Sequence, residues 1–100
     1  MGRGPRQKPL RLGEKLRRIR EALDLSQNGM LIRLKLDGTS VGRNSISAYE
    51  LGQREPPLLV LYEYAKAANV HMEVLVDDEL DLPKIIPAEE KKIARKRKNS

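Results

Sequence analysis

The chain has 100 residues, of which 39% are hydrophobic and 34% charged, and its formal net charge is +6. This length allows one small domain with a core just large enough to fold alone, which excludes a large multi-substrate enzyme. The chain has no cysteine and a single histidine, so a disulfide scaffold and a thiolate metal site are excluded and a zinc site is not expected.

The N-terminus "MGRGPRQKPL" is basic but lacks the apolar region that a signal peptide requires, and no apolar run approaches the length of a membrane span. Residues 1–20 hold eight basic side chains against Glu14 alone, and residues 91–98 hold six more. Such blocks predict flexible arms, which are either attracted to polyanions such as nucleic acid or serve only solubility. We therefore expect a cytoplasmic protein with no membrane contact.

The first predicted helix covers residues 11–24. Leu12, Leu16, Ile19 and Leu23 follow one another at spacings of four, three and four residues, which is the apolar stripe of an amphipathic helix. The stripe predicts that one edge of this helix faces a core.

A second helix is predicted to begin after Ser26, whose side-chain oxygen can accept a hydrogen bond from an unpaired backbone N–H of the first turn. Its inward residues would be Met30, Leu31 and Leu34, although Gly29 weakens the helix by about 1 kcal/mol relative to alanine. The same stretch has an alternative interpretation. "IRLKL" alternates apolar and charged residues and "DG" follows it, which is typical of a β-hairpin.

The third predicted helix runs from Arg43 to Leu51, with Gly42 as a cap. When Ile46 faces the core, the outer side of the helix carries small and polar residues. These are Asn44, Ser47 and Ala48. This helix is therefore expected to be buried along one edge only.

Two further helices are predicted after the break "GQREPP". Pro57 fits the first turn of a fourth helix. The apolar stripe of this helix is predicted at Leu58, Leu61, Tyr62 and Ala65. A short fifth helix, "HMEVLVD", is expected to close the core with Val74 and Leu75.

The composition changes after residue 77, where acidic residues and prolines dominate. The predicted organisation is a basic flexible arm over 1–10, a folded domain over 11–77, and an acidic connector with a basic C-terminal tail over 78–100. A cluster of carboxylates spans this boundary, namely Asp77, Asp78, Glu79 and Asp81. Carboxylates can hold a divalent cation, but a solvated, charge-balancing connector is the preferred interpretation. No metal and no cofactor are expected.

The runs "LGEKLRRIREALDLSQ", "VGRNSISAYELGQREP" and "LLVLYEYAKAANVHMEVL" resemble the helix-turn-helix family of the Cro and lambda-repressor type, also called the xenobiotic-response-element type. The resemblance covers residues 11 to about 77. It implies an all-α, compact five-helix DNA-binding domain whose third helix lies in the major groove. Two features depart from the family. Leu31 replaces a small residue, and the insertion at 35–41 either lengthens the second helix or forms a loop or hairpin near the DNA backbone.

The resemblance assigns base contacts to four residues of the third helix. They are Arg43, Asn44, Ser47 and Ala48. Arg can make a bidentate contact with guanine and Asn with adenine, while Ala is small enough to meet a thymine methyl group. A phosphate contact is the alternative for Arg43.

Phosphate contacts are assigned to one residue at the start of the second helix and to others in the turns on either side of the third. They are Gln27, Arg54, Lys35 and Thr39. Plain solvent exposure is the alternative for Gln27 and Arg54. The resemblance also pairs Arg20 with Glu50, as a structural ion pair that fixes how the third helix projects.

The expected function is sequence-specific binding of double-stranded DNA by a transcriptional repressor, acting as a homodimer on a two-fold operator through the helix at about 43–51. Half-sites would lie about 10 bp apart, or a multiple of that distance. One alternative is an antitoxin of the same fold that holds a small toxin protein through residues 78–87. The other is a non-catalytic, protein-binding adaptor. The sequence shows no catalytic constellation, so an enzyme is not expected, and the expected location is the cytoplasm in association with the nucleoid.

Overall fold

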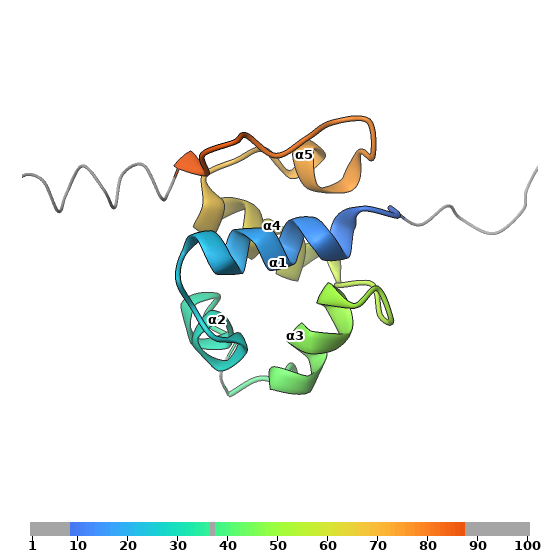
Figure 1. The fold of residues 1–100 in the computed structure, drawn as a ribbon. Coiled ribbons are helices and arrows are strands. Elements are labelled where there is room, and N and C mark those ends of the chain that lie inside the picture. The colour runs from blue at the N-terminus through green and yellow to red at the C-terminus, as the bar shows by residue number, and fades with distance from the viewer. Residues whose placement is uncertain (1–8, 37, 88–100) are drawn as a thin grey trace, which may run out of the picture.

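A computed structural model describes residues 9–36 and 38–87, and these residues form five α-helices and no strand (Figure 1). The helices are α1 (Leu12–Ala22), α2 (Gln27–Arg33), α3 (Arg43–Glu50), α4 (Leu58–Ala68) and α5 (Met72–Val76). The expected all-α, five-helix architecture is therefore confirmed. The hairpin alternative is wrong, because "IRLKL" begins inside α2 and leaves it through a turn. Residues 1–8 of the predicted arm and residues 88–100 of the predicted tail lie outside the described residues.

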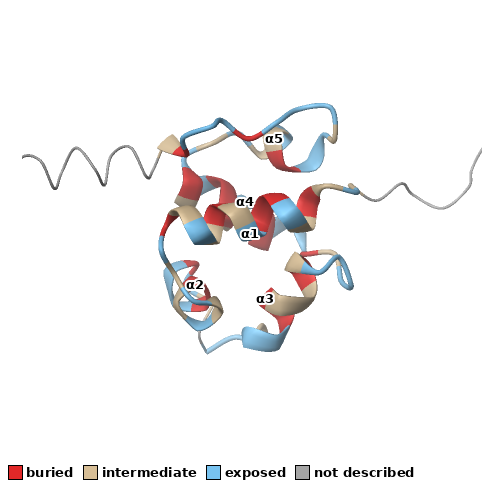
Figure 2. Ribbon diagram, in the orientation of Figure 1, coloured by how far each residue is buried: buried red, intermediate tan, exposed pale blue. Residues whose placement is uncertain are grey.

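Helix α1 lies at the centre of the molecule, with α2 and α3 on one side of it and α5 on the other (Figure 1). Its stripe is buried as predicted, and Leu16 and Ile19 have no exposed surface. Leu75 of α5 is also fully buried, while Val74 packs against the edge of the core. The apolar faces of all five helices thus meet in one cluster around α1 (Figure 2).

The predicted stripe of α4 is only half right. Leu61 and Ala65 are buried, but the stripe continues through Tyr64 and Ala68. Leu58 and Tyr62 are 69% and 48% exposed. The buried residues of α4 are therefore Val60, Leu61, Tyr64, Ala65 and Ala68. Pro57 precedes the helix as its N-cap in an extended conformation.

The insertion before α3 forms a loop and does not lengthen α2. Lys35 takes a left-handed conformation, with φ 61°, and its N–H donates to Ile32 O while the N–H of Leu36 donates to Leu31 O. This bonding pattern closes a helix end in the Schellman manner. Beyond position 37, which is not described, the Thr39 hydroxyl accepts from the N–H of Val41 at 3.1 Å.

Residues 78–87, here called the strap, follow α5 and pass along α1 (Figure 1). The strap has no regular secondary structure up to residue 86, yet Leu82 and Ile86 are only 7% and 1% exposed and belong to the core cluster. The predicted domain boundary at residue 77 stays a prediction, but the packed core extends beyond it to Ile86.

Helices α1 and α3 meet closely at Gly13, where a side chain would not fit. A Cβ atom on Gly13 would lie 2.6 Å from Glu50 O and 2.9 Å from Tyr49 O. These are backbone atoms at the end of α3, so they cannot move aside without moving the helix. Gly13 therefore sets how near the end of α3 lies to α1.

We predict that Gly13→Ala destabilises the protein, by roughly 1 to 3 kcal/mol, because the added methyl group overpacks this contact. Helix propensity alone predicts that the same substitution stabilises the protein, since alanine favours a helix by up to about 1 kcal/mol over glycine. Urea denaturation measures the difference. Gly42→Ala is the control for an added methyl group without overpacking, because no atom outside the neighbouring residues lies within 4 Å of its Cβ position. A Gly13→Ala protein as stable as the wild type would show that α3 can shift away from α1 without a loss of folding free energy.

Candidate nucleic-acid interface

Helix α3 has two faces of opposite character. Ile46 and Tyr49 are 0% and 3% exposed and fix the helix to the core. The other face carries the predicted base-contacting residues, of which Arg43 and Asn44 are exposed and Ser47 and Ala48 half-buried. The exposed end of α3 is also visible as pale blue ribbon in Figure 2. The structure thus brings all four residues to one side of one helix.

The first turn of α3 is held from two directions through Ser45, which is 9% exposed. Its hydroxyl oxygen accepts hydrogen bonds from the N–H of Gly42 at 3.4 Å and from Arg54 Nη1 at 3.3 Å. Arg54 is therefore tied to α3 although it lies in the following turn. Ser45 could not be identified from the sequence, because its role depends on where Arg54 folds back.

The orientation of α3 depends on a bidentate ion pair. Arg20 Nε lies 2.7 Å from Glu50 Oε2, and Arg20 Nη2 lies 3.1 Å from Glu50 Oε1. The third guanidinium nitrogen, Nη1, donates to Leu25 O at 2.9 Å. The two side chains are only 17% and 4% exposed. One side chain of α1 thus binds the end of α3 and the connection to α2 together.

The surroundings of this ion pair are largely shielded from solvent. The Tyr64 hydroxyl is buried with no hydrogen-bond partner among the described residues, and its burial, reinforced by the Glu50 carboxylate, raises the pKa of Tyr64. The hydrogen bond to Glu50 raises the pKa of the Arg20 guanidinium. Burial thus disfavours the charged form of Tyr64, whereas the carboxylate partner favours the charged form of Arg20.

Gln27 is connected to the same pair. Its Nε2 donates to Glu50 Oε1 at 3.3 Å, and the residue is half-buried. The amide nitrogen therefore has a partner inside the protein, whereas the predicted phosphate contact stays a prediction. Position 27 follows Ser26, whose hydroxyl oxygen caps α2 by accepting from the N–H of Gly29 at 2.9 Å.

Lys35 and Thr39 are both exposed, on the loop between α2 and α3. An open hollow lies between the start of α2 and the start of α3. It is lined by Asn28, Ser40, Gly42, Arg43, Asn44 and Ser45. Asn28 and Ser40 were absent from the predicted site, because they come from two segments that only the folded chain brings beside Asn44.

The charge of this region is positive where it is exposed. Between residues 26 and 54 the basic side chains are Arg33, Lys35, Arg43 and Arg54, and all four are exposed. The acidic ones are Asp37, which is outside the described residues, and Glu50, which is neutralised by Arg20. A polyanion approaching α3 would therefore meet cations and no free carboxylate among the described side chains of this stretch.

A family model described as helix-turn-helix matches residues 16–75, which is more than half of the chain. The chain belongs to the helix-turn-helix family. Its type is that of lambda repressor and Cro, as the resemblance implied, and its kind of function is that of a DNA-binding transcription regulator. Comparisons with curated proteins and with solved structures gave no match.

Within residues 9–36 and 38–87, no three His, Cys, Asp or Glu side chains are grouped to hold a metal ion. None of the helices in this part of the helix-turn-helix chain has the length and apolar character needed to cross a membrane. Family members of this kind are generally non-enzymatic.

We predict that Glu50→Ala lowers the free energy of unfolding by roughly 3 kcal/mol, because Arg20 is left without its counter-charge in a largely buried position. Glu63→Ala should cost less than about 1 kcal/mol, since Glu63 pairs with Lys66 on the surface of α4. Thermal and urea unfolding of both variants measure the contrast. Equal, small losses would show that the pair contributes little to stability.

Proposed function

We propose that this helix-turn-helix protein is a transcriptional repressor that reads a two-fold operator through α3. The observation that carries the proposal is the bare outer face of α3, where Arg43 and Asn44 are exposed on a helix whose other face is fixed to the core. A polar, rigidly held helix face of this kind has the size and chemistry to enter the major groove.

The four side chains on this face suit different base edges. Arg43 can donate two hydrogen bonds to guanine, and Asn44 can pair with the donor and acceptor of adenine. The Ser47 hydroxyl can hydrogen-bond to donors or acceptors on the base edges, while the methyl group of Ala48 can contact that of thymine. Because they come from one short helix, together they would cover only a few successive base pairs.

The phosphate contacts are proposed on both sides of α3. Arg54 follows the helix and is oriented by Ser45, while Lys35 and Thr39 lie on the preceding loop. Gln27 would contact a phosphate beside the first turn of α2. Such contacts position the protein without reading sequence.

We further propose that the repressor is a homodimer joined through the outer flank of α4. Leu58, Leu59 and Tyr62 lie on one side of this helix and are 69%, 73% and 48% exposed. Glu63 and Lys66 carry opposite charges on the next turn, so a second copy rotated by 180° can present a matching charge to each. In Figure 1, α4 lies behind α1 while α2 and α3 lie below it, so this pairing leaves α3 open to DNA.

The antitoxin alternative receives no such support. It placed a toxin partner on residues 78–87, but Leu82 and Ile86 of that segment are buried in the protein's own core. Those two side chains are thus unavailable to a partner while the strap is in place. We therefore do not extend the proposal to a toxin partner.

Selection of bound duplexes from a random-sequence pool tests the proposed function directly. A repressor that reads a two-fold operator selects a motif with two-fold symmetry, whose half-sites are about 10 bp apart or a multiple of that distance. A wild-type chain that selects no motif would contradict sequence-specific reading and favour the adaptor. A motif without symmetry would contradict the dimer but leave base reading intact.

We predict that Asn44→Ala weakens binding to the selected site by about 1 to 3 kcal/mol and relaxes the preference at one symmetric pair of positions. Arg54→Ala should weaken all duplexes by a similar factor, because a phosphate contact carries no sequence information. Both variants should remain folded, since both side chains are exposed. Titrations of the site and of its single-base variants, at fixed salt, measure the effect. Unchanged base preference in Asn44→Ala would exclude Asn44 as a base reader.

We predict that Leu59→Glu weakens self-association at least about tenfold, because each dimer would bury two carboxylates in an apolar contact. Ile85→Glu is the matched control, since Ile85 is 52% exposed on the strap, outside the proposed interface. Sedimentation equilibrium of the three proteins gives the dissociation constants. Similar constants for both variants would rule out the flank of α4 as the dimer interface.

A further inference from the structure

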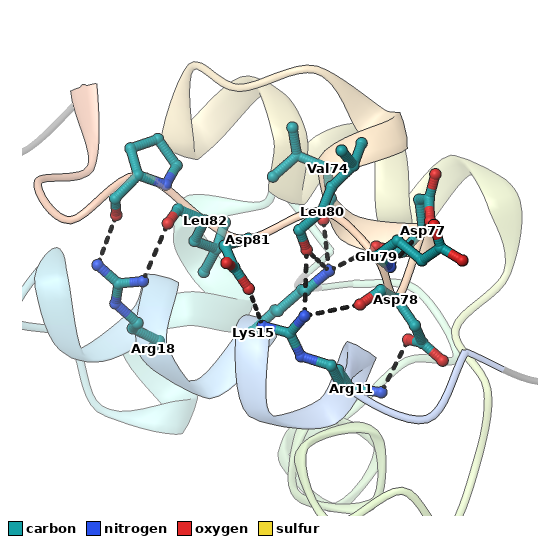
Figure 3. A network of polar contacts seen from close by, with 11 residues as sticks. Arg11, Lys15, Arg18, Val74, Asp77, Asp78, Glu79, Leu80, Asp81 and Leu82 are labelled. Atoms are coloured by element: carbon teal, nitrogen blue, oxygen red, sulfur yellow. Dashed lines mark hydrogen bonds and ion pairs between the residues drawn. The ribbon is translucent and has the colours of Figure 1, made fainter.

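Lys15 and Asp78 fasten the strap to α1 (Figure 3). Lys15 is buried, and its Nζ donates to three backbone oxygens, namely Val74 O at 2.7 Å, Leu80 O at 2.8 Å and Asp77 O at 3.0 Å. These bonds use all three hydrogens of the ammonium group, while burial lowers the pKa of Lys15. Lys15 therefore has no donor left for a ligand.

The Asp78 carboxylate is also paired inside the protein. Its Oδ2 accepts from the N–H of Leu10 at 2.8 Å and its Oδ1 from the N–H of Arg11 at 3.0 Å. These two N–H groups hold the pKa of Asp78 below its usual value. The polar contacts on this side of α1 thus serve the fold.

The polar side chains near the starts of α2 and α3 divide into two groups. Four are hydrogen-bonded inside the protein, namely Ser26, Gln27, Thr39 and Ser45. Four others are exposed and have no hydrogen-bond or ion-pair partner among the described residues, namely Asn28, Ser40, Arg43 and Asn44. All four unpaired side chains line the open hollow between the two helices. Their donors are therefore available to a ligand at one place.

Thr39 and Ser40 are neighbours in the loop but differ in their hydrogen bonds. The Thr39 hydroxyl donates to Leu36 O and accepts from the N–H of Val41. A bond from this hydroxyl to a phosphate would require the bond to Leu36 to break. The Ser40 hydroxyl has no partner among the described residues, so it can donate to a ligand without such a change.

The chemistry of the hollow suits an anion. Its described lining contains no carboxylate, and Arg43 adds a positive charge. The Asn28 amide has two N–H donors and the Ser40 hydroxyl has one, and both groups are uncharged. Asn and Ser side chains are common hydrogen-bond donors to DNA phosphates. Asn28 and Ser40 lie on α2 and on the loop, outside the α3 face that is proposed to read the bases.

We propose that Asn28 and Ser40 together bind one phosphate of the DNA backbone in this hollow. The inference rests on the proposed function and leaves Arg43 available for a base edge. Because both donors are uncharged, they hold the phosphate without neutralising it. The site therefore adds affinity that does not change with salt, unlike a contact made by a cation such as Arg54.

The first experiment measures duplex affinity against salt. Asn28→Ala and Ser40→Ala should each weaken binding to every duplex about tenfold, since each loses a hydrogen bond to a charged group. The slope of log affinity on log salt should keep its wild-type value in both. Arg54→Ala is the comparison, because loss of a cationic contact should flatten that slope by about 0.9. Urea unfolding should show both variants to be as stable as the wild type, since neither side chain has a partner among the described residues.

A second experiment locates the phosphate. Single phosphates of the selected duplex are replaced in turn by methylphosphonate, which is uncharged and has fewer acceptor oxygens. The wild type should lose about tenfold in affinity at one position of each half-site. Asn28→Ala and Ser40→Ala should lose much less at that same position, because the contact is already absent. Arg54→Ala should lose as much there as the wild type.

Three outcomes would overturn the phosphate site alone. The first is wild-type affinity in Asn28→Ala or Ser40→Ala. The second is a methylphosphonate profile in which neither variant differs from the wild type at any position. The third is a changed base preference in Asn28→Ala, which would make Asn28 a base reader. A wild-type chain that binds no duplex DNA would instead overturn the proposed function, and this inference with it.

Discussion

The guanidinium group of Arg20 is the point on which the arrangement of the helices depends. Its three nitrogens bind the Glu50 carboxylate and Leu25 O, and Gln27 reaches the same carboxylate. A buried ion pair loses so much hydration that replacing it with apolar side chains is often neutral or stabilising. The pair contributes a defined orientation of α3 relative to α1, because a bidentate contact fixes the relative orientation of two planar groups. The angle at which α3 leaves the core is therefore set by an interaction that apolar packing alone would not define.

One face of α3 is not packed against the rest of the domain, and this lowers the stability that α3 can contribute. Only Ile46 and Tyr49 among the large side chains of this helix are buried, so α3 contributes little to a core that is small from the start. The strap compensates on the opposite side of α1, where Leu82 and Ile86 join the cluster. The part of the fold that would meet DNA and the part that completes the core are thus separated by α1.

The helical period predicted the buried side of most helices, although not the full stripe of α4, and it could not predict features that depend on residues distant in the chain. The stripe of α1 and the outer face of α3 both follow from helical spacing. The strap has no period, and Lys15 and Asp78 bind atoms 59 to 68 residues away, so neither role can be inferred from neighbouring residues. The need for glycine at position 13 cannot be predicted from the first helical turn alone, because it arises from the close approach of the end of α3. The pairing of Arg20 with Glu50, which lie 30 residues apart in the chain, came from the family resemblance.

The loop between α2 and α3 joins two helices whose ends are closed by hydrogen bonds at the two margins of the loop. α2 ends through the hydrogen bonds made by Lys35 and Leu36, and α3 begins at Gly42 with the support of Ser45. Lengthening such a loop costs little, since each doubling of a flexible loop adds only about 0.6 kcal/mol of closure entropy. The loop is therefore a site where chain length can change without moving either helix. Insertions there would add or remove contacts outside the groove, and so alter the footprint of the protein on DNA separately from the bases that α3 is proposed to read.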